Sequence, residues 1–129
     1  MQNTPNSIGY VELAYAIQHQ LSFGAVRNRS GAFIRADLDS LADAARGPGV
    51  AGAPQPSITD PPGKNAYPIA AFTWIVVPPS IADPAKRALL NGLLRWILTS
   101  GQKECSALGY VPLPRDVANS ELRRIKSFQ

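Results

Sequence analysis

The residues best suited to bind an anion lie close together in RNRSGAF, the segment from Arg27 to Phe33. Two guanidinium groups, those of Arg27 and Arg29, stand beside the dipeptide Ser30-Gly31. Arginine pairs with oxyanions through several N–H donors, and backbone amides around such a turn can form a concave anion site. The four residues are therefore candidate ligands for an oxyanion. A solvated basic turn explains the same pattern and is the interpretation we favour, because dehydrated phosphate needs several convergent donors.

The other residues with distinctive chemistry stand apart from one another. His19 has no second histidine or cysteine at ligand spacing, which favours a surface or capping role over a metal site. Cys105 has Lys103 nearby but no adjoining histidine, so a packed, inert thiol is favoured over a nucleophile. No serine-elbow, phosphate-loop, zinc or dinucleotide motif occurs, and most acidic residues sit where helix caps are expected. We predict a protein that is not an enzyme and that has no catalytic residues, metal or cofactor.

Aromatic and basic residues are assigned structural roles by similar reasoning. Trp74 falls in an apolar run and Trp96 on the apolar side of an expected helix, so both are predicted to lie in the core. Arg123, Arg124 and Lys126 lie on the last expected helix, where a solvated face is favoured over a surface for nucleic acid or membrane. The net charge is +4 and only 17% of the residues are charged. This balance indicates a weakly basic domain without a nucleic-acid partner.

Length and composition permit one ordinary domain, since the chain has 129 residues of which 45% are hydrophobic. Its single cysteine cannot form an internal disulfide, which fits a reduced compartment or an exported protein without bridges. The first residues lack the basic start and apolar run of an export signal, and no apolar run reaches the roughly 18 residues of a membrane span. We expect a soluble chain whose signal, if it has one, lies in a missing upstream portion, or a truncated or split product.

Periodicity and turn residues predict short alternating strands and helices. The expected elements of the first half are a strand over 7–11, a helix over 12–20, strands over 23–28 and 33–35, and a helix that Asp37 caps and that ends near Gly47. Residues 47–63 hold five prolines and four glycines, which predicts an irregular surface link.

The second half is expected to contain one buried strand and three helices. The run FTWIVV over 72–77 has no polar alternation, which is typical of a strand covered on both faces. Asp83 and Pro84 predict the start of a helix that buries Leu89, Leu93, Trp96 and Ile97 and stops at Gly101 in a left-handed conformation. Further helices are expected over 102–108 and 115–128, the last with Ala118, Leu122 and Ile125 facing inward.

Three stretches of the chain together resemble the end of one family. They are SIGYVELAYAIQHQLSF over 7–23, AFIRADLDSLADAARG over 32–47, and the segment over 65–114 that runs from NAYPIAAFTWIVVPPS through GLLRWILTSG to GYVPLP. In this order they resemble the C-terminal portion of the PstS-type phosphate-binding proteins, the solute receptors of a phosphate ABC importer. The resemblance covers nearly the whole chain but only the last part of the family's length.

The resemblance implies an α/β fold with two lobes that close on phosphate, with incomplete sheets flanked by helices in this chain. Residues 1–64 would end the second lobe, residues 65–129 would return to complete the first, and residues 61–68 would carry a hinge crossing. Inorganic phosphate and a membrane permease would be the partners, and the location would be periplasmic or extracytoplasmic. In the family the phosphate ligands come mainly from earlier loops, so no ligand residue is carried over.

Each lobe would lack part of its sheet, which would expose strand edges and apolar surface. We therefore expect the chain to pair with a second copy or with the missing N-terminal portion, or to be poorly stable, and we expect it not to bind phosphate unaided. The alternative is an interaction or regulatory protein that keeps a PstS-like fold without ligand binding. A small basic nucleic-acid binder ranks behind both.

Overall fold

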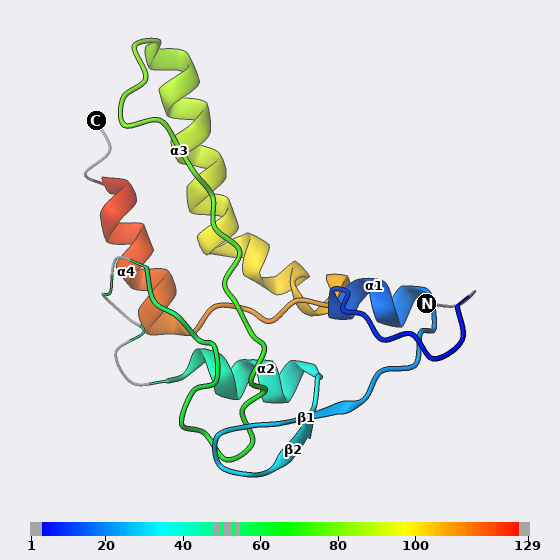
Figure 1. Ribbon diagram of the computed structural model, residues 1–129. Coiled ribbons are helices and arrows are strands. Elements are labelled where there is room, and N and C mark those ends of the chain that lie inside the picture. The colour runs from blue at the N-terminus through cyan, green and yellow to red at the C-terminus, as the bar shows by residue number, and fades with distance from the viewer. Residues whose placement is uncertain (1–3, 48–49, 51–52, 54, 127–129) are drawn as a thin grey trace.

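The computed structural model describes residues 4–47, 50, 53 and 55–126 of the chain. The described part combines helices with one small two-stranded sheet (Figure 1). The elements in chain order are α1 (Leu13–Gln18), β1 (Ala25–Arg27), β2 (Phe33–Arg35), α2 (Leu38–Ala45), α3 (Pro84–Leu98), the 3₁₀ helices η1 (Ser100–Glu104) and η2 (Ser106–Leu108), and α4 (Arg115–Lys126). None of the described helices has both the length and the apolar character to cross a membrane.

The two strands form an antiparallel hairpin in which Val26 pairs with Ile34. The amide of Asn28 donates to the carbonyl of Ala32 at 2.9 Å and closes the ladder at the turn. Gly31 adopts a φ of 84°, a conformation that glycine reaches without the penalty that a side chain imposes. Both short strands predicted here are confirmed.

Local capping chemistry determines where α2 and α3 begin. The carboxylate of Asp37 accepts from the Ser40 amide at 2.7 Å while the Ser40 hydroxyl accepts from the Asp37 amide, which completes a capping box. Asp83 accepts from the two amides that follow Pro84, at 2.8 and 3.2 Å. Both predicted helix starts are confirmed.

The expected stop of α3 at Gly101 is wrong. The described glycines with positive φ are Gly31 and Gly109, and α3 ends at Leu98 before the chain continues into η1 and η2. Gly101 instead permits a close approach, because a Cβ there would lie 3.1 Å from the Trp96 carbonyl oxygen and from its ring. The left-handed stop comes at Gly109, with a φ of 81°, after the two 3₁₀ turns. The helix expected over 102–108 is therefore two short 3₁₀ helices.

Two predicted strands are absent from the described residues. Residues 7–11 and 72–77 have no strand assignment, and large side chains in both segments are exposed. Their composition favours extended backbone, but a strand also needs a neighbour to which its amides can bond. The structure provides such a neighbour only between β1 and β2.

The core is small and consists mainly of small side chains. It joins α2 to the link, the start of the second half and α4 through Ala44, Ala45, Val50, Ile58, Ala66, Ala70 and Val117. No large side chain among the described residues is fully buried. Of the residues predicted to face inward from α4, Ala118 is buried and Leu122 and Ile125 are half-buried.

Candidate functional site

All four predicted anion ligands lie in the β1–β2 turn, and Asn28 organises that turn. The Asn28 side chain is nearly fully buried, with the residue only 4% exposed. Its Oδ1 accepts from the amides of Ser30 and Ala32, both at 3.1 Å. Its Nδ2 donates to carbonyls at the end of the link and just beyond it, those of Gly63, Lys64 and Ala66, at 3.3, 2.9 and 3.1 Å. One carboxamide therefore holds the turn against residues more than thirty positions away.

The amides of the turn are engaged inside the protein. Those of Ser30 and Ala32 bind Asn28 Oδ1, and that of Gly31 donates to the Asn28 carbonyl at 2.9 Å. The Arg29 amide donates to the Asp60 carboxylate at 2.9 Å, so an acidic group already occupies the place of an anion. A phosphate at this turn would have to displace these acceptors, because each amide has only one hydrogen to donate.

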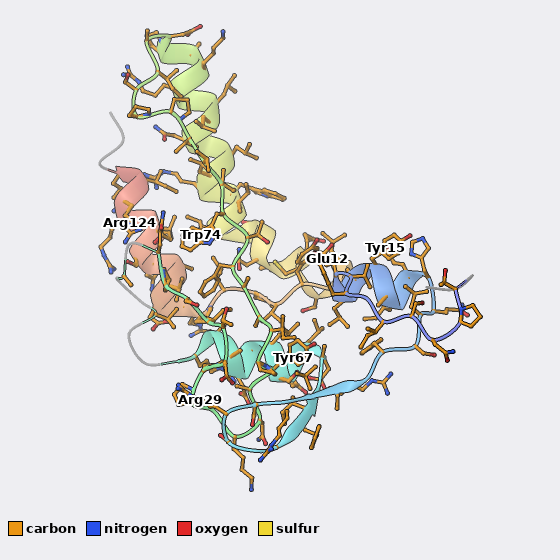
Figure 2. All side chains as sticks on the ribbon, in the orientation of Figure 1. Glu12, Tyr15, Arg29, Tyr67, Trp74 and Arg124 are labelled. Carbon is orange, nitrogen blue, oxygen red and sulfur yellow. The ribbon has the colours of Figure 1, made fainter. Side chains whose placement is uncertain are left out.

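The arginine side chains of the turn remain accessible. Arg27 and Arg29 are exposed, and a Cβ at Gly31 would lie 3.5 Å from the Arg27 guanidinium, which folds back over the turn. In Figure 2, Arg29 lies at the hairpin, well away from Arg124 on α4. The structure thus brings the four candidates together and leaves two guanidinium groups available. Their role as phosphate ligands stays a prediction.

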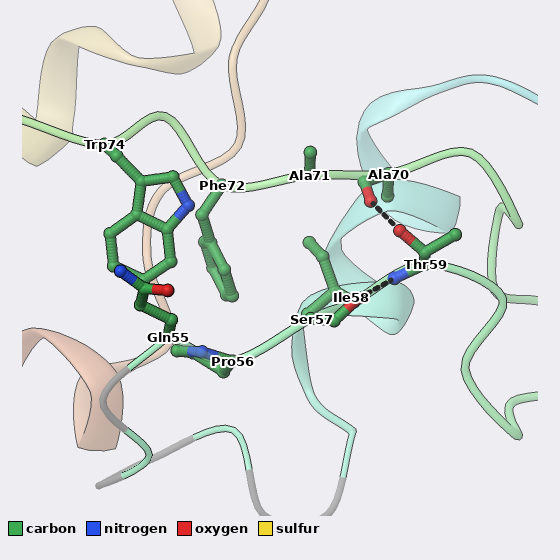
Figure 3. A pocket seen from close by; sticks show the side chains of 9 residues that line it. All are labelled: Gln55, Pro56, Ser57, Ile58, Thr59, Ala70, Ala71, Phe72 and Trp74. Atoms are coloured by element: carbon green, nitrogen blue, oxygen red, sulfur yellow. Dashed lines mark hydrogen bonds between the residues drawn. The ribbon is translucent and has the colours of Figure 1, made fainter.

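A groove of about 310 Å³ lies where the link meets the chain entering the second half. Its walls are residues 55–59 on one side and Ala70, Ala71, Phe72 and Trp74 on the other (Figure 3). Thr59 Oγ1 donates to the Ala70 carbonyl at 3.4 Å, and the rings of Phe72 and Trp74 meet edge to face at 6.2 Å. No charged residue lines this groove, so its chemistry suits apolar contact rather than anion capture.

A second groove, of about 330 Å³, separates α3 from α4. It brings Arg95 of α3 together with Arg123 and Lys126 of α4. The neighbouring Arg124 is not part of it, because its guanidinium pairs with Glu121 at 3.3 Å and donates to the Ala53 carbonyl at 3.0 Å. All three groove cations are exposed, and solvent therefore weakens their attraction for an anion. Sequence reasoning had no signal for Arg95, which meets α4 only through the packing of the two helices.

The isolated candidates have local roles. His19 stacks on Tyr15 with ring centroids 3.8 Å apart, and its Nδ1 lies 3.0 Å from the Tyr15 carbonyl oxygen at the end of α1. Cys105 is half-buried, with Sγ 4.0 Å from the Gly101 carbonyl oxygen. No cluster of three or more metal-ligating side chains occurs within the described ranges. His19 is exposed, as expected for a residue at the surface.

Both tryptophans depart from the prediction of core positions. Trp74 is 51% exposed and Trp96 is 52% exposed. The predicted buried face of α3 is likewise open at Leu89 and Leu93, while Leu94, which was not predicted to be buried, is buried. The prediction was wrong because an apolar pattern indicates which surfaces can be covered, and no described residue covers these side chains.

Two ionisable groups are perturbed by identifiable neighbours. Hydrogen bonds from the Ser40 amide and then from its hydroxyl lower the pKa of Asp37 below its ordinary value. A hydrogen bond from the Tyr110 hydroxyl to Glu12, followed by the negative charge of that carboxylate, raises the pKa of Tyr110. The first contact caps α2 and the second links the start of α1 to the chain after η2, so both are structural.

The described residues thus combine a turn whose amides are occupied, one groove without charged residues, one basic groove, and several uncovered apolar side chains. Curated relatives match this chain along most of its length. The chain is 37% identical over 116 residues to the phosphate-binding protein PstS of Xylella fastidiosa strain Temecula1, covering 88% of this chain and 32% of that protein. It is 37% identical to the PstS of Methanocaldococcus jannaschii over an alignment of 143 residues, covering 100% of this chain and 36% of that protein.

The PstS of Haemophilus influenzae is 31% identical over 122 residues, covering 88% of the chain and 35% of that protein. No family model matches the chain. Along nearly its whole length the chain is similar to PstS phosphate-binding proteins, and it spans about a third of the length of the curated relatives it matches. This share is consistent with the C-terminal portion that the sequence predicts.

Proposed function

We propose that this chain is the C-terminal portion of the phosphate-binding component of an ABC-type phosphate importer. The observation that carries this proposal is the similarity to PstS proteins along 86–100% of the chain. The component captures inorganic phosphate outside the cytoplasmic membrane and presents it to the membrane permease. The relatives bear the name of binding proteins, and the task proposed for this chain is likewise binding without chemical change.

This portion does not bind phosphate unaided. A dehydrated phosphate needs several convergent donors, usually amides at helix starts, hydroxyls and an arginine. The turn that offers two arginines has its amides engaged by Asn28 and Asp60. High-affinity capture therefore requires donors from the part of the receptor that this chain does not span, with Arg27 and Arg29 as candidate contributors of charge.

The proposed receptor has two lobes, and this chain contributes to both. Residues 1–64 end the second lobe, residues 65–129 complete the first, and residues 61–68 carry one crossing between them. In support of close contact at this crossing, the small core contains Ala44 and Ile58 from the first stretch and Ala66 and Val117 from the second. The crossing is therefore part of a packed region rather than a free tether.

Titration calorimetry with inorganic phosphate tests the proposal. The chain is titrated by itself and again as a complex with the part of a PstS relative that it does not match. We expect no heat of binding from the chain by itself and one site in the complex. Tight phosphate binding by the chain alone would contradict the predicted incompleteness, and absence of binding in a folded complex would contradict the receptor function.

The second candidate is an interaction or regulatory protein that keeps this fold without a ligand. The occupied amides of the hairpin turn favour it, because they leave no preformed anion cradle there. The same titration separates the two candidates, since a regulatory protein gives a folded complex that binds no phosphate.

A further inference from the structure

The positive charge of the chain is concentrated on α3 and α4. The chain has 13 lysine and arginine residues against 9 aspartate and glutamate residues, a net charge of +4. Helices α3 and α4 together carry seven of these cations and two of the acids, which is a net charge of +5 and leaves −1 for the rest of the chain. The basic character of this protein is thus a property of one helix pair rather than of its whole surface.

Three of these cations line the groove between the two helices. Helices α3 and α4 contact each other and lie side by side in Figure 1. Arg95 lines the groove of about 330 Å³ from α3, and Arg123 and Lys126 line it from α4. The other lining residues are uncharged, namely Thr99, Asn119 and Leu122. The groove thus gathers three positive charges from two helices, of which the sequence pattern of α4 indicates only two.

The acidic residues of α4 do not neutralise this groove. Glu121 pairs with Arg124 at 3.3 Å and, two positions from Arg123, lies on a different side of the helix. Asp116 lies in the first turn, where its Oδ1 accepts from the Val117 amide at 3.0 Å. Helix α3 contains no acidic residue. The three exposed groove cations therefore present their combined charge to solvent.

Exposed cations suit an extended anionic surface better than a small anion. Solvent screens each exposed charge, so one small anion in an open groove gains little. A bilayer with many negative charges attracts every nearby lysine and arginine at once, and each of them contributes about fivefold in affinity. Single-stranded nucleic acid also carries many charges, but its sites usually add aromatic side chains that stack on bases. No aromatic residue lines this groove.

We propose that the basic groove of α3 and α4, formed by Arg95, Arg123 and Lys126, docks this protein on the anionic phospholipid surface of a membrane. The choice of lipid as the partner rests on the proposed function, because a receptor that delivers phosphate to a permease works beside a bilayer. The contact is electrostatic and reversible, since its cations are exposed. Attraction to this surface raises the concentration of the receptor near the permease.

Co-sedimentation with lipid vesicles tests the inference without inorganic phosphate. The full chain is mixed with phosphatidylcholine vesicles that contain about 30 mol% phosphatidylglycerol, and separately with phosphatidylcholine vesicles alone. We expect binding to the anionic vesicles at an ionic strength of about 0.05 M and its loss at about 0.5 M, where charges are screened within about 4 Å. Binding that survives the higher salt, or equal binding to neutral vesicles, would overturn the inference, because apolar side chains would then make the contact.

A matched pair of double variants locates the contact. Arg95→Gln with Arg123→Gln removes one groove cation from each helix, whereas Arg46→Gln with Lys64→Gln removes the same charge elsewhere. All four residues are exposed, and glutamine keeps the helix propensity, so both variants should fold, which circular dichroism checks. We expect the groove variant to bind anionic vesicles roughly 30-fold more weakly and the control variant less than about threefold more weakly. Equal effects of the two variants would overturn the inference.

A charge-keeping variant and two competitors separate a lipid surface from other anions. Arg95→Lys with Arg123→Lys keeps both charges and should bind anionic vesicles within about threefold of the unchanged chain. Inorganic phosphate at about 1 mM should not release the chain from the vesicles. A single-stranded oligonucleotide should bind more weakly than vesicles of equal negative charge. Loss of binding in the lysine variant, release by phosphate, or tighter binding of the oligonucleotide would overturn the inference.

Phosphate binding by the receptor complex is measured separately by titration calorimetry. Vesicle binding by a chain whose complex binds no phosphate supports the basic groove and contradicts the receptor function. Phosphate binding by a complex whose chain does not bind anionic vesicles supports the receptor function and overturns the role of the groove. The two failures are therefore distinguishable.

Discussion

The hairpin with its link and the segment leading into α3 differ in how their polar backbone groups are satisfied. Around Asn28, turn amides and link carbonyls converge on one buried carboxamide, and Asp60 supplies a further acceptor. Between Ala71 and Val77 the backbone bonds to no described residue. The first region satisfies its polar groups within this chain, whereas the backbone of the second has no partner among the described residues. Adjacent stretches of one chain thus differ in how completely their hydrogen bonds are formed.

Replacing Asn28 should have the largest effect, because it tests whether the hairpin region is self-sufficient. Asn28→Ala removes the contacts of this carboxamide with two amides and three carbonyls, of which four are part-buried and the one to Ala66 is buried. We expect the free energy of unfolding to fall by about 2–4 kcal/mol, measured by urea denaturation. Ser30→Ala at the exposed turn is the control and should change it by less than about 0.5 kcal/mol. Equal effects would show that the Asn28 contacts do not hold the link.

Gly109→Ala tests a close contact that involves packing rather than hydrogen bonds. The residue has a φ of 81°, and a Cβ there would lie 3.0 Å from the Ala14 Cβ of α1. Strain and crowding together should cost about 1–3 kcal/mol, measured as a lower thermal midpoint. Gly24→Ala, with no atom within 4 Å of the added Cβ, is the matched control. A Gly109→Ala midpoint equal to that of the control would exclude this contact from the folded state.

The capping carboxylate of α2 gives a smaller, pH-dependent effect within the hairpin region. Asp37→Ala should cost about 1 kcal/mol at neutral pH through loss of the N-cap. Since its pKa is lowered in the folded state, the stability it contributes is present above the unfolded value of about 3.9 and is lost as the pH falls through the folded value. Asp37→Asn keeps a capping oxygen and should flatten the acid limb of stability against pH. If Asp37→Asn left the acid limb unchanged, the assignment of this pH dependence to Asp37 would be contradicted.

The smallest effect on stability is expected on the exposed apolar face of α3. Leu89→Ser on α3 should change the stability of the free chain by less than about 0.5 kcal/mol, because Leu89 is 74% exposed. The same substitution should weaken the complex with the missing receptor portion. Denaturation and sedimentation on the same sample check both expectations. A large loss of stability in the free chain would show that Leu89 is covered, and the contrast between the two regions would disappear.

The elements that sequence reasoning predicted correctly depend on neighbours in the chain. Asp37 with Ser40 and Asp83 with Pro84 are complete signals within a few residues, so the starts of α2 and α3 could be predicted. The Asn28 contacts join residues 35–38 positions apart and have no local signature. The strand predicted over 72–77 from composition is absent from the described structure, because a strand also needs a hydrogen-bonded neighbour, which composition does not specify. The sequence located the candidate turn. It could not show that Asn28 and Asp60 bind the amides of this turn, because those contacts depend on the folded arrangement.

The Asn28 carboxamide also limits where the chain around the proposed crossing can bend. It binds the carbonyls of Gly63, Lys64 and Ala66, while the Tyr67 amide donates to the Ser40 carbonyl and the Asp60 amide to that of Pro68. Residues 61–68, where we propose a crossing between lobes, are thereby held to the hairpin and to α2 at successive positions. If the receptor closes by a hinge movement, these bonds would make the hairpin turn and residues 61–68 move together as one body.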